Sequence, residues 1–191
     1  KKFGKSEGNA VWLDANLTSP YHFYQFWINA DDKDVVRFLK YYTFLSLEEI
    51  KSLENSAASA PEKREAQKAL AEKVTEFVHG EEAFRNAEKI SENLFGGKTK
   101  NLSEKDLKQI FSDSSVKKLE KIEGLNIVDL LILSEAVSSK RQAREDIQNG
   151  AIELNGEKIS DPDYIVGKKD LLFGQYIIAK RGKRDYKFIS R

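Results

Sequence analysis

Apolar and polar positions follow two different patterns along the chain. From residue 19 to residue 95 the apolar residues recur every three or four positions, which is the period of helices that bury one side. After residue 125 two helical stretches are followed by short apolar runs joined at glycines, a pattern typical of a small sheet. We therefore predict a set of helices followed by a small α+β module.

Local capping signals place the helices of the first part. Ser19-Pro20 combines a favoured cap residue with a favoured first helical residue, ahead of YHFYQFWIN. Asp31 and Asp32 precede a second run, DVVRFLKYYTFL, and Ser46-Leu47-Glu48-Glu49 has the form of a capping box. The aromatic stripe in HFYQFW predicts core packing, and a surface for base stacking is the alternative.

A fourth helix is predicted after Ala60-Pro61, in EKREAQKALAEKVTEFVHG. Four of its residues recur at helical spacing and are expected to line one apolar stripe: Ala66, Leu70, Val74 and Phe77. Gly80 is suited to the position that ends this helix, and EEAFRNAEKISENLF follows as a fifth.

A polar, lysine-rich stretch separates the two parts. We expect residues 1–18 to belong to a preceding domain, 19–95 to form a helical domain, 96–125 a linker with one or two helical turns, and 126–191 the α+β module. In that module Ser139 caps SKRQAREDIQN, and the dipeptide Asn155-Gly156 predicts a type I′ hairpin. The last run, YIIAKRGKRDYKFIS, predicts a second hairpin.

Composition limits the chemistry. Of the 191 residues 40% are hydrophobic, and 32 Lys and Arg nearly balance 31 Asp and Glu. The absence of cysteine excludes thiolate sites, only two histidines are present, and we expect no metal site. No apolar run reaches the roughly 20 residues of a membrane helix, and no signal peptide is recognisable. We expect a cytoplasmic protein without a membrane partner, and the start without methionine suggests a piece of a longer protein.

The distribution of charge is more informative than its sum. In SKRQARED, basic residues share a helix face, and the final hairpin turn is a run of cations. A basic helix face beside a basic hairpin suits an RNA backbone, and a solvated charged surface is the alternative. The candidate RNA-binding residues are Lys140, Arg141, Arg144, Lys180, Arg181, Lys183 and Arg184.

Three stretches together resemble one family. SSKRQAREDIQNGAIELNGEKI resembles the RNA-binding domain named after the fourth small-subunit ribosomal protein. KFGKS at residues 2–6, followed by EGN, resembles the KMSKS loop of class I aminoacyl-tRNA synthetases, with Phe3 and Gly4 departing from the usual Met and Ser. SPYHFYQFWINADDKDV resembles the start of the anticodon-binding domain of bacterial tyrosyl-tRNA synthetases. The order of the three is that of the C-terminal half of this family.

The resemblance implies a role for the first residues. In the family this loop closes over ATP while tyrosine attacks the α-phosphate, so Lys2 and Lys5 would stabilise charge on the pyrophosphate and Ser6 would add a hydrogen bond. ATP, with its magnesium, is then a substrate of the complete enzyme. The HIGH motif and the tyrosine pocket do not occur in these residues, so we expect this chain alone to bind no cofactor and to be inactive.

The resemblance also implies partners. The helical domain would face the anticodon of the tyrosine tRNA, and the terminal module its long variable arm. The complete enzyme would be a homodimer through the missing domain, and this chain a monomer.

Two of these interpretations have alternatives. Asp31 and Asp32 are candidates for anticodon contacts, because a carboxylate accepts hydrogen bonds from base edges, but they also suit the start of a helix. For the chain as a whole, the alternative is a free-standing RNA-binding regulator without chemistry. The gene sequence upstream of Lys1 distinguishes the two, since a HIGH motif there indicates the ligase.

Overall fold

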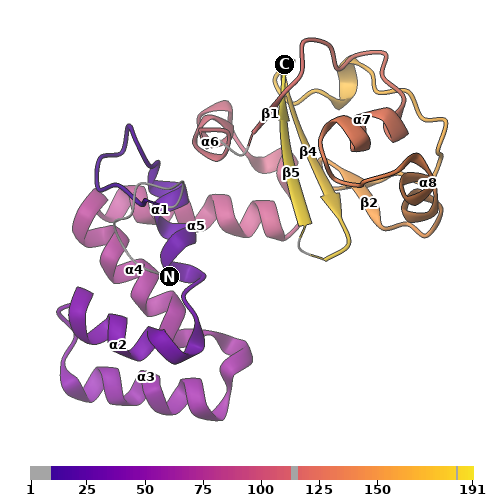
Figure 1. Ribbon diagram of the computed structural model, residues 1–191. Coiled ribbons are helices and arrows are strands. Elements are labelled where there is room, and N and C mark those ends of the chain that lie inside the picture. Colours follow the sequence, from indigo (N-terminus) through magenta and orange to yellow (C-terminus); the bar gives the residue numbers. More distant parts are fainter. Residues whose placement is uncertain (1–9, 113–115, 184) are drawn as a thin grey trace. The chain divides into compact units, whose positions relative to one another are not determined.

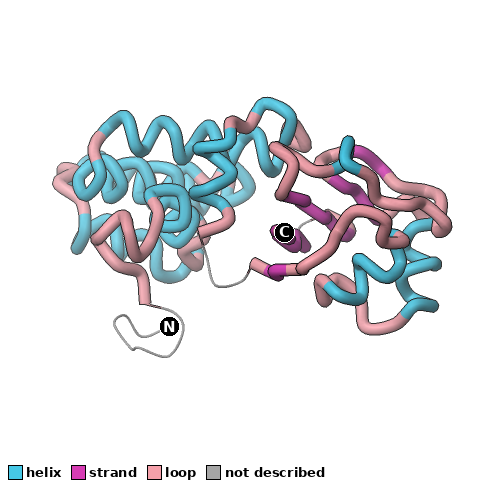
Figure 2. The backbone as a smooth tube through the Cα atoms, turned by 90° about the horizontal axis from the view of Figure 1, so that it is seen from above, coloured by secondary structure: helices cyan, strands magenta, loops and turns pink. Residues whose placement is uncertain are grey.

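The chain forms two compact units, residues 1–91 and 92–191. The structure is a computed structural model that describes residues 10–112, 116–183 and 185–191. Within these ranges the first unit is helical, and all strands belong to the second unit, as the tube in Figure 2 shows. The fold is therefore α+β, as predicted.

The helices of the first unit begin where the capping signals predict. Ser19 accepts a hydrogen bond from the backbone N–H of His22 (3.3 Å), and Pro20 is the first helical residue. Ser46 and Glu49 form the predicted capping box, with Glu49 N–H donating to Ser46 Oγ (3.2 Å). The helices and the short 3₁₀ turn are α1 (Pro20–Ile28), α2 (Asp32–Tyr42), α3 (Leu47–Ser59), η1 (Pro61–Lys63), α4 (Glu65–His79) and α5 (Glu81–Phe95), of which α5 crosses the division between the units.

The helix α4 packs against α1, α2 and α3 and so organises the core of the first unit (Figure 1). Phe23 of α1, Leu39 of α2 and Leu70 of α4 are almost completely buried. The aromatic stripe of α1 lies in this core, because Tyr21, Phe23, Tyr24 and Trp27 are all buried. Core packing, and not base stacking, is therefore the role of that stripe.

The prediction for Phe77 was wrong, because its side chain is 68% exposed. The buried positions of α4 come in adjacent pairs that recur every four residues, at 66/67, 70/71 and 74/75, and position 77 falls outside this series. Phe77 instead contacts Phe44 at the surface, with ring centroids 5.2 Å apart.

The second unit is built on a five-stranded sheet of order β1-β5-β4-β2-β3. The strand β1 pairs with β5 in parallel, and the other neighbours are antiparallel. The turn at Asn155-Gly156 has positive φ at both residues (50° and 82°), as the type I′ prediction requires. The elements are η2 (Thr99–Asn101), α6 (Glu104–Ile110), β1 (Lys117–Lys118), α7 (Ile127–Leu133), α8 (Lys140–Gln148), β2 (Ile152–Leu154), β3 (Glu157–Lys158), η3 (Lys168–Asp170), β4 (Tyr176–Arg181) and β5 (Asp185–Ser190).

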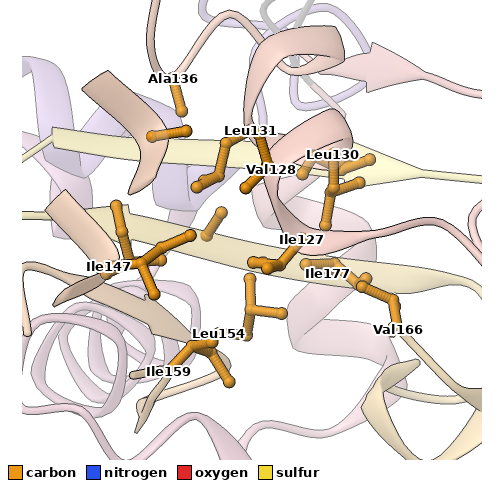
Figure 3. Close-up of a cluster of buried hydrophobic side chains, with 14 of the residues drawn as sticks. Ile127, Val128, Leu130, Leu131, Ala136, Ile147, Leu154, Ile159, Val166 and Ile177 are labelled. Atoms are coloured by element: carbon orange, nitrogen blue, oxygen red, sulfur yellow. The ribbon is translucent and has the colours of Figure 1, made fainter. Parts of the chain in front are cut away.

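One face of the sheet, here called the α7–α8 face, is covered by these two helices (Figure 1). Ile127, Leu130 and Leu131 of α7 pack with Ile147 of α8 and with Ile177 of β4, and Figure 3 shows these side chains meeting above the strands. None of these five is more than 1% exposed, so this face holds the main core of the unit.

The opposite face is covered by residues 94–111, here called the covering segment. Phe111 lies against Tyr176 of β4 and Phe188 of β5, with ring centroids 4.6 and 5.5 Å apart. Leu107 and Ile110 of α6 are fully buried, and the Thr99 hydroxyl donates to the backbone carbonyl of Asn155.

Residues 96–125, predicted as a linker, therefore form part of the second unit, and the division lies inside α5. The lysine-rich composition misled the prediction because most of the lysines are exposed, whereas Leu102, Leu107, Ile110 and Ile122 among them are buried. No helix in the described ranges is long and apolar enough to span a membrane.

Candidate RNA-binding surface

The helix α8 presents the predicted cations on a rigid element. Ser139 caps it by accepting from the backbone N–H of Gln142 (3.2 Å). Ala143 and Ile147 are buried against the core, which turns the charged positions between them outward. The helix therefore has two flanks outside the core, one with Lys140 and Arg144, the other with Gln142 and Asp146.

Two of the α8 cations already have carboxylate partners. Lys140 Nζ lies 2.7 Å from Asp129 Oδ1, and Arg141 Nε lies 2.9 Å from Glu145 Oε1. Such exposed pairs contribute little free energy, about 0–1 kcal/mol, so a phosphate can compete for either cation. Arg144 is exposed and has no ion pair within the described ranges. It is the α8 cation most available to an anion.

Lys180 and Arg181 are neighbours in β4, and their side chains lie on opposite faces of the sheet because side chains alternate along a strand. Arg181 Nε donates to Asp146 Oδ2 of α8 (2.7 Å), so Arg181 lies on the α7–α8 face. Lys180 Nζ lies 3.1 Å from Glu153 and 5.9 Å from the centre of the Tyr186 ring, and its side chain is only 19% exposed.

Lys180 and Tyr186 line a small space together with Leu94 and Thr99, so they face the covering segment. The structure thus brings Arg181 to α8 and takes Lys180 away from it. The signal that separates the two residues is the period of two in the strand YIIAKR, which places neighbouring side chains on opposite faces of a sheet.

The turn between β4 and β5 carries Lys183, which is exposed and unpaired within the described part of the chain, next to Gly182 at φ 62°. Arg184 lies outside the described residues, as do Lys2, Lys5 and Ser6. Their predicted roles stay predictions.

Sequence reasoning missed one cation on the face of Arg181. Lys117 of β1 forms an ion pair with Glu135 (2.5 Å). This pair, followed by the field of Lys187, lowers the pKa of the Glu135 carboxyl. Lys187 shares the face of Arg181, because positions 181, 185 and 187 have the same parity in the ladder. The α7–α8 face thus has more cations at its margin than the charge run alone indicates.

The two anticodon candidates have different surroundings. The Asp32 carboxylate accepts a hydrogen bond from the Gln67 amide of α4. Asp31 occupies the cap position of α2, yet its side chain makes no capping bond and is exposed. Of the two, Asp31 keeps its carboxylate available to another donor. Within the described ranges, no group of three or more His, Asp or Glu is arranged to hold a metal ion.

Comparison with known proteins covers both units. Residues 1–96 match the family model "tRNA synthetases class I (W and Y)", and residues 106–189 match "Tyrosine--tRNA ligase SYY-like C-terminal domain". A tyrosine–tRNA ligase of Streptococcus uberis is 54% identical over 190 residues, which are 100% of this chain and 46% of that protein. One of Bacillus pumilus is 52% identical over 189 residues, 99% of this chain and 45% of that protein.

A solved structure gives a weaker match. A C-terminally truncated mitochondrial tyrosyl-tRNA synthetase of Aspergillus nidulans is 36% identical, with a TM-score of 0.44 over 45% of this chain and 25% of that one. The chain thus spans about half the length of the curated relatives that it matches. The first unit matches the synthetase model and the second the C-terminal-domain model, and the chain belongs to the class I tRNA synthetases of the W and Y group, among the tyrosine–tRNA ligases.

Proposed function

We propose that this chain is the tRNA-binding part of a tyrosine–tRNA ligase, which attaches tyrosine to its tRNA through a tyrosyl-adenylate made from ATP. The observation that carries the proposal is the cationic margin of α8 and the β4–β5 turn, in a unit that matches a tyrosine–tRNA ligase C-terminal domain. The second unit binds the tRNA backbone through these cations, and the part of the tRNA that it contacts is the long variable arm.

The charges of the two units support different contacts with the tRNA, the second unit with the backbone and the first with the anticodon. Residues 1–91 contain 13 Lys and Arg against 15 Asp and Glu, and residues 92–191 contain 19 against 16. Phosphate contacts draw their free energy from cations and released counterions, so the second unit is the better backbone ligand. The first unit contacts the anticodon, with Asp31 as the carboxylate that accepts from a base edge.

The catalytic step needs more than this chain. In the complete ligase Lys2 and Lys5 stabilise the charge that develops on the pyrophosphate of ATP, and Ser6 adds a hydrogen bond to it. One loop does not position both ATP and tyrosine, so the chain alone gives no tyrosyl-adenylate. The complete ligase is a cytoplasmic homodimer that uses ATP with magnesium, and this chain by itself is a monomer.

Salt-dependent binding to the tyrosine tRNA tests the proposal. Replacing Arg144 and Lys183 with Gln together is expected to weaken binding and to flatten the log–log salt dependence by about 0.7–0.9 per lost phosphate contact. The matched control replaces Lys168 and Lys169, two exposed lysines of η3. Equal losses from both double variants, or no binding of tRNA by the unchanged chain, would contradict the proposal.

A transcript with a shortened variable arm tests the assignment of the RNA target. On that transcript the Arg144 and Lys183 substitutions are expected to lose most of their effect, since the surface has no backbone left to contact. Equal effects on both transcripts would mean that the module binds another part of the tRNA.

A further inference from the structure

A hollow of about 510 Å³ opens on the α7–α8 face of the second unit. Its lining comes from the chain between α7 and α8, from α8 itself and from the two strands of the last hairpin. Ala136 and Val137, 4% and 6% exposed, supply apolar lining. The polar lining comes from Gln142, Arg181 and Asp185, with Glu135 and Ser138 completing it.

Two hydrogen-bond donors in the hollow, the side chains of Arg181 and Gln142, are held in place by hydrogen bonds to other residues of the protein. Arg181 uses Nε for its bond to Asp146 of α8, which leaves its two terminal nitrogens as donors. Gln142 Oε1 accepts from the backbone N–H and the hydroxyl of Ser138, at 3.3 and 3.2 Å, so its amide NH₂ stays a donor. Both donor groups are thus oriented before any ligand arrives.

An acceptor lies beside them. Asp185 is the cross-strand partner of Arg181 in the ladder between β4 and β5, so both side chains leave the same face of the sheet. One Asp185 oxygen lies 3.5 Å from Lys187 Nζ, and the side chain is 46% exposed. A carboxylate at this place repels phosphate. Glu135, the other carboxylate of the lining, is paired with Lys117.

Apolar lining with a guanidinium and a carboxylate side by side matches a nucleobase better than a phosphate. Guanine alone among the RNA bases offers two neighbouring acceptors, O6 and N7, to a guanidinium and two neighbouring donors, N1–H and the N2 amine, to a carboxylate. Resting on the proposed function, we infer that this hollow receives one unpaired guanine of the bound tRNA, with Arg181 on its O6/N7 edge and Asp185 on its N1/N2 edge. The second unit then recognises one base in addition to binding the phosphate backbone.

The sign of one substitution separates a base from a phosphate. Asp185→Asn, in the complete chain, is expected to weaken binding of the tyrosine tRNA transcript about tenfold and to leave its salt dependence unchanged, because base contacts release few counterions. If a phosphate lay in the hollow, removing this negative charge would strengthen binding and the inference would be overturned. Asp163→Asn, at an exposed position with the same charge, is the control and is expected to have no effect.

Modified transcripts identify the base. Inosine, which lacks the N2 amine, is placed at one unpaired guanosine at a time. At one position it is expected to weaken binding by the unchanged chain about tenfold and to cost nothing further with Asp185→Asn. Additive losses at every position, or no loss at any, would overturn the inference while the salt-dependent test of the proposed function still stands. A chain that binds no tRNA at all would overturn both.

Discussion

The two faces of the five-stranded sheet are covered in different ways. The α7–α8 face has a core of aliphatic side chains, from helices that follow a regular apolar period. The other face is covered by a segment whose composition is that of a linker, through the aromatic contacts of Phe95 with Tyr186 and of Phe111 with Tyr176 and through the hydrogen bond of Thr99. A few well-placed residues in a polar segment can therefore close one face of a sheet, and such a closure escapes composition-based reasoning.

Removing the covering segment is the strongest test of this comparison. A chain of residues 116–191 keeps the α7–α8 core but exposes the other face of the sheet, so we expect it to lose cooperative thermal unfolding. A chain of residues 92–191 retains the segment and serves as the control. Equal melting temperatures of the two chains, measured by circular dichroism, would show that the second face needs no cover.

Leu107→Ala measures whether the covering segment forms a true core. The residue is fully buried, so the substitution is expected to lower the free energy of unfolding by about 2–5 kcal/mol, as in other cores. Leu130→Ala, on the α7–α8 face, is the matched comparison and Leu133→Ala, at a side chain 44% exposed, is the control. A loss at Leu107 no larger than that at Leu133, in urea titrations, would contradict the comparison.

Gly156→Ala tests the contact between the hairpin turn and the covering segment. A Cβ at this position would lie 2.4 Å from the carbonyl oxygen of Gly97, and φ is +82°. We expect a loss of about 1–3 kcal/mol in the free energy of unfolding, from strain and from displacement of the segment. Gly174→Ala has a similar φ of +73° and nothing within 4 Å, so it isolates the backbone cost. Identical losses would mean that the approach to Gly97 is unimportant.

Alkaline pH gives the smallest and most selective effect. Burial, together with the hydrogen bond to Asp170, raises the pKa of Tyr164, beside the α7–α8 core, to about 12. A folded-state pKa above the unfolded value stabilises the fold below pH 10, and this contribution is lost as the pH rises from about 10 to 12. Tyr164→Phe is therefore expected to flatten the decline of stability above pH 10, followed by denaturant titration.

Burial also raises the pKa of Tyr186, on the covered face, and Tyr186→Phe is the matched comparison on that side. We expect Tyr164→Phe to change the alkaline decline of stability more than Tyr186→Phe does. A larger change from Tyr186→Phe would contradict this expectation.

Local chemistry explains which features could be predicted from the sequence. The caps at Ser19, Ser46 and Ser139 and the Asn155-Gly156 turn depend on a few neighbouring residues, and all four are confirmed. The position of Phe77 could not be predicted in this way, because the phase of a buried stripe drifts along a helix and depends on the partners. The covering segment depends on contacts with strands more than fifty residues later, which no local pattern contains.

The candidate RNA-binding residues were found by charge and then separated by geometry. A count of cations indicates an anionic partner but does not say toward which face of the sheet each side chain points. The register of β4 and β5 supplies that information. The ion pair of Arg181 with Asp146 holds the Arg181 side chain beside α8. The roles of these residues in RNA binding stay predictions.

The opposite orientation of Lys180 and Arg181 has a consequence for mutational scanning. Lys180→Ala and Arg181→Ala remove the same charge from adjacent positions, so a scan scored by RNA binding alone would place them in one class. The first acts through the ion pair with Glu153 and the ring of Tyr186, and the second through its bond to Asp146 of α8 and its place in the lining of the hollow. Recording protein abundance beside binding would separate a variant that folds poorly from one that recognises poorly, and so assign each lysine or arginine of this hairpin to the side of the sheet on which it acts.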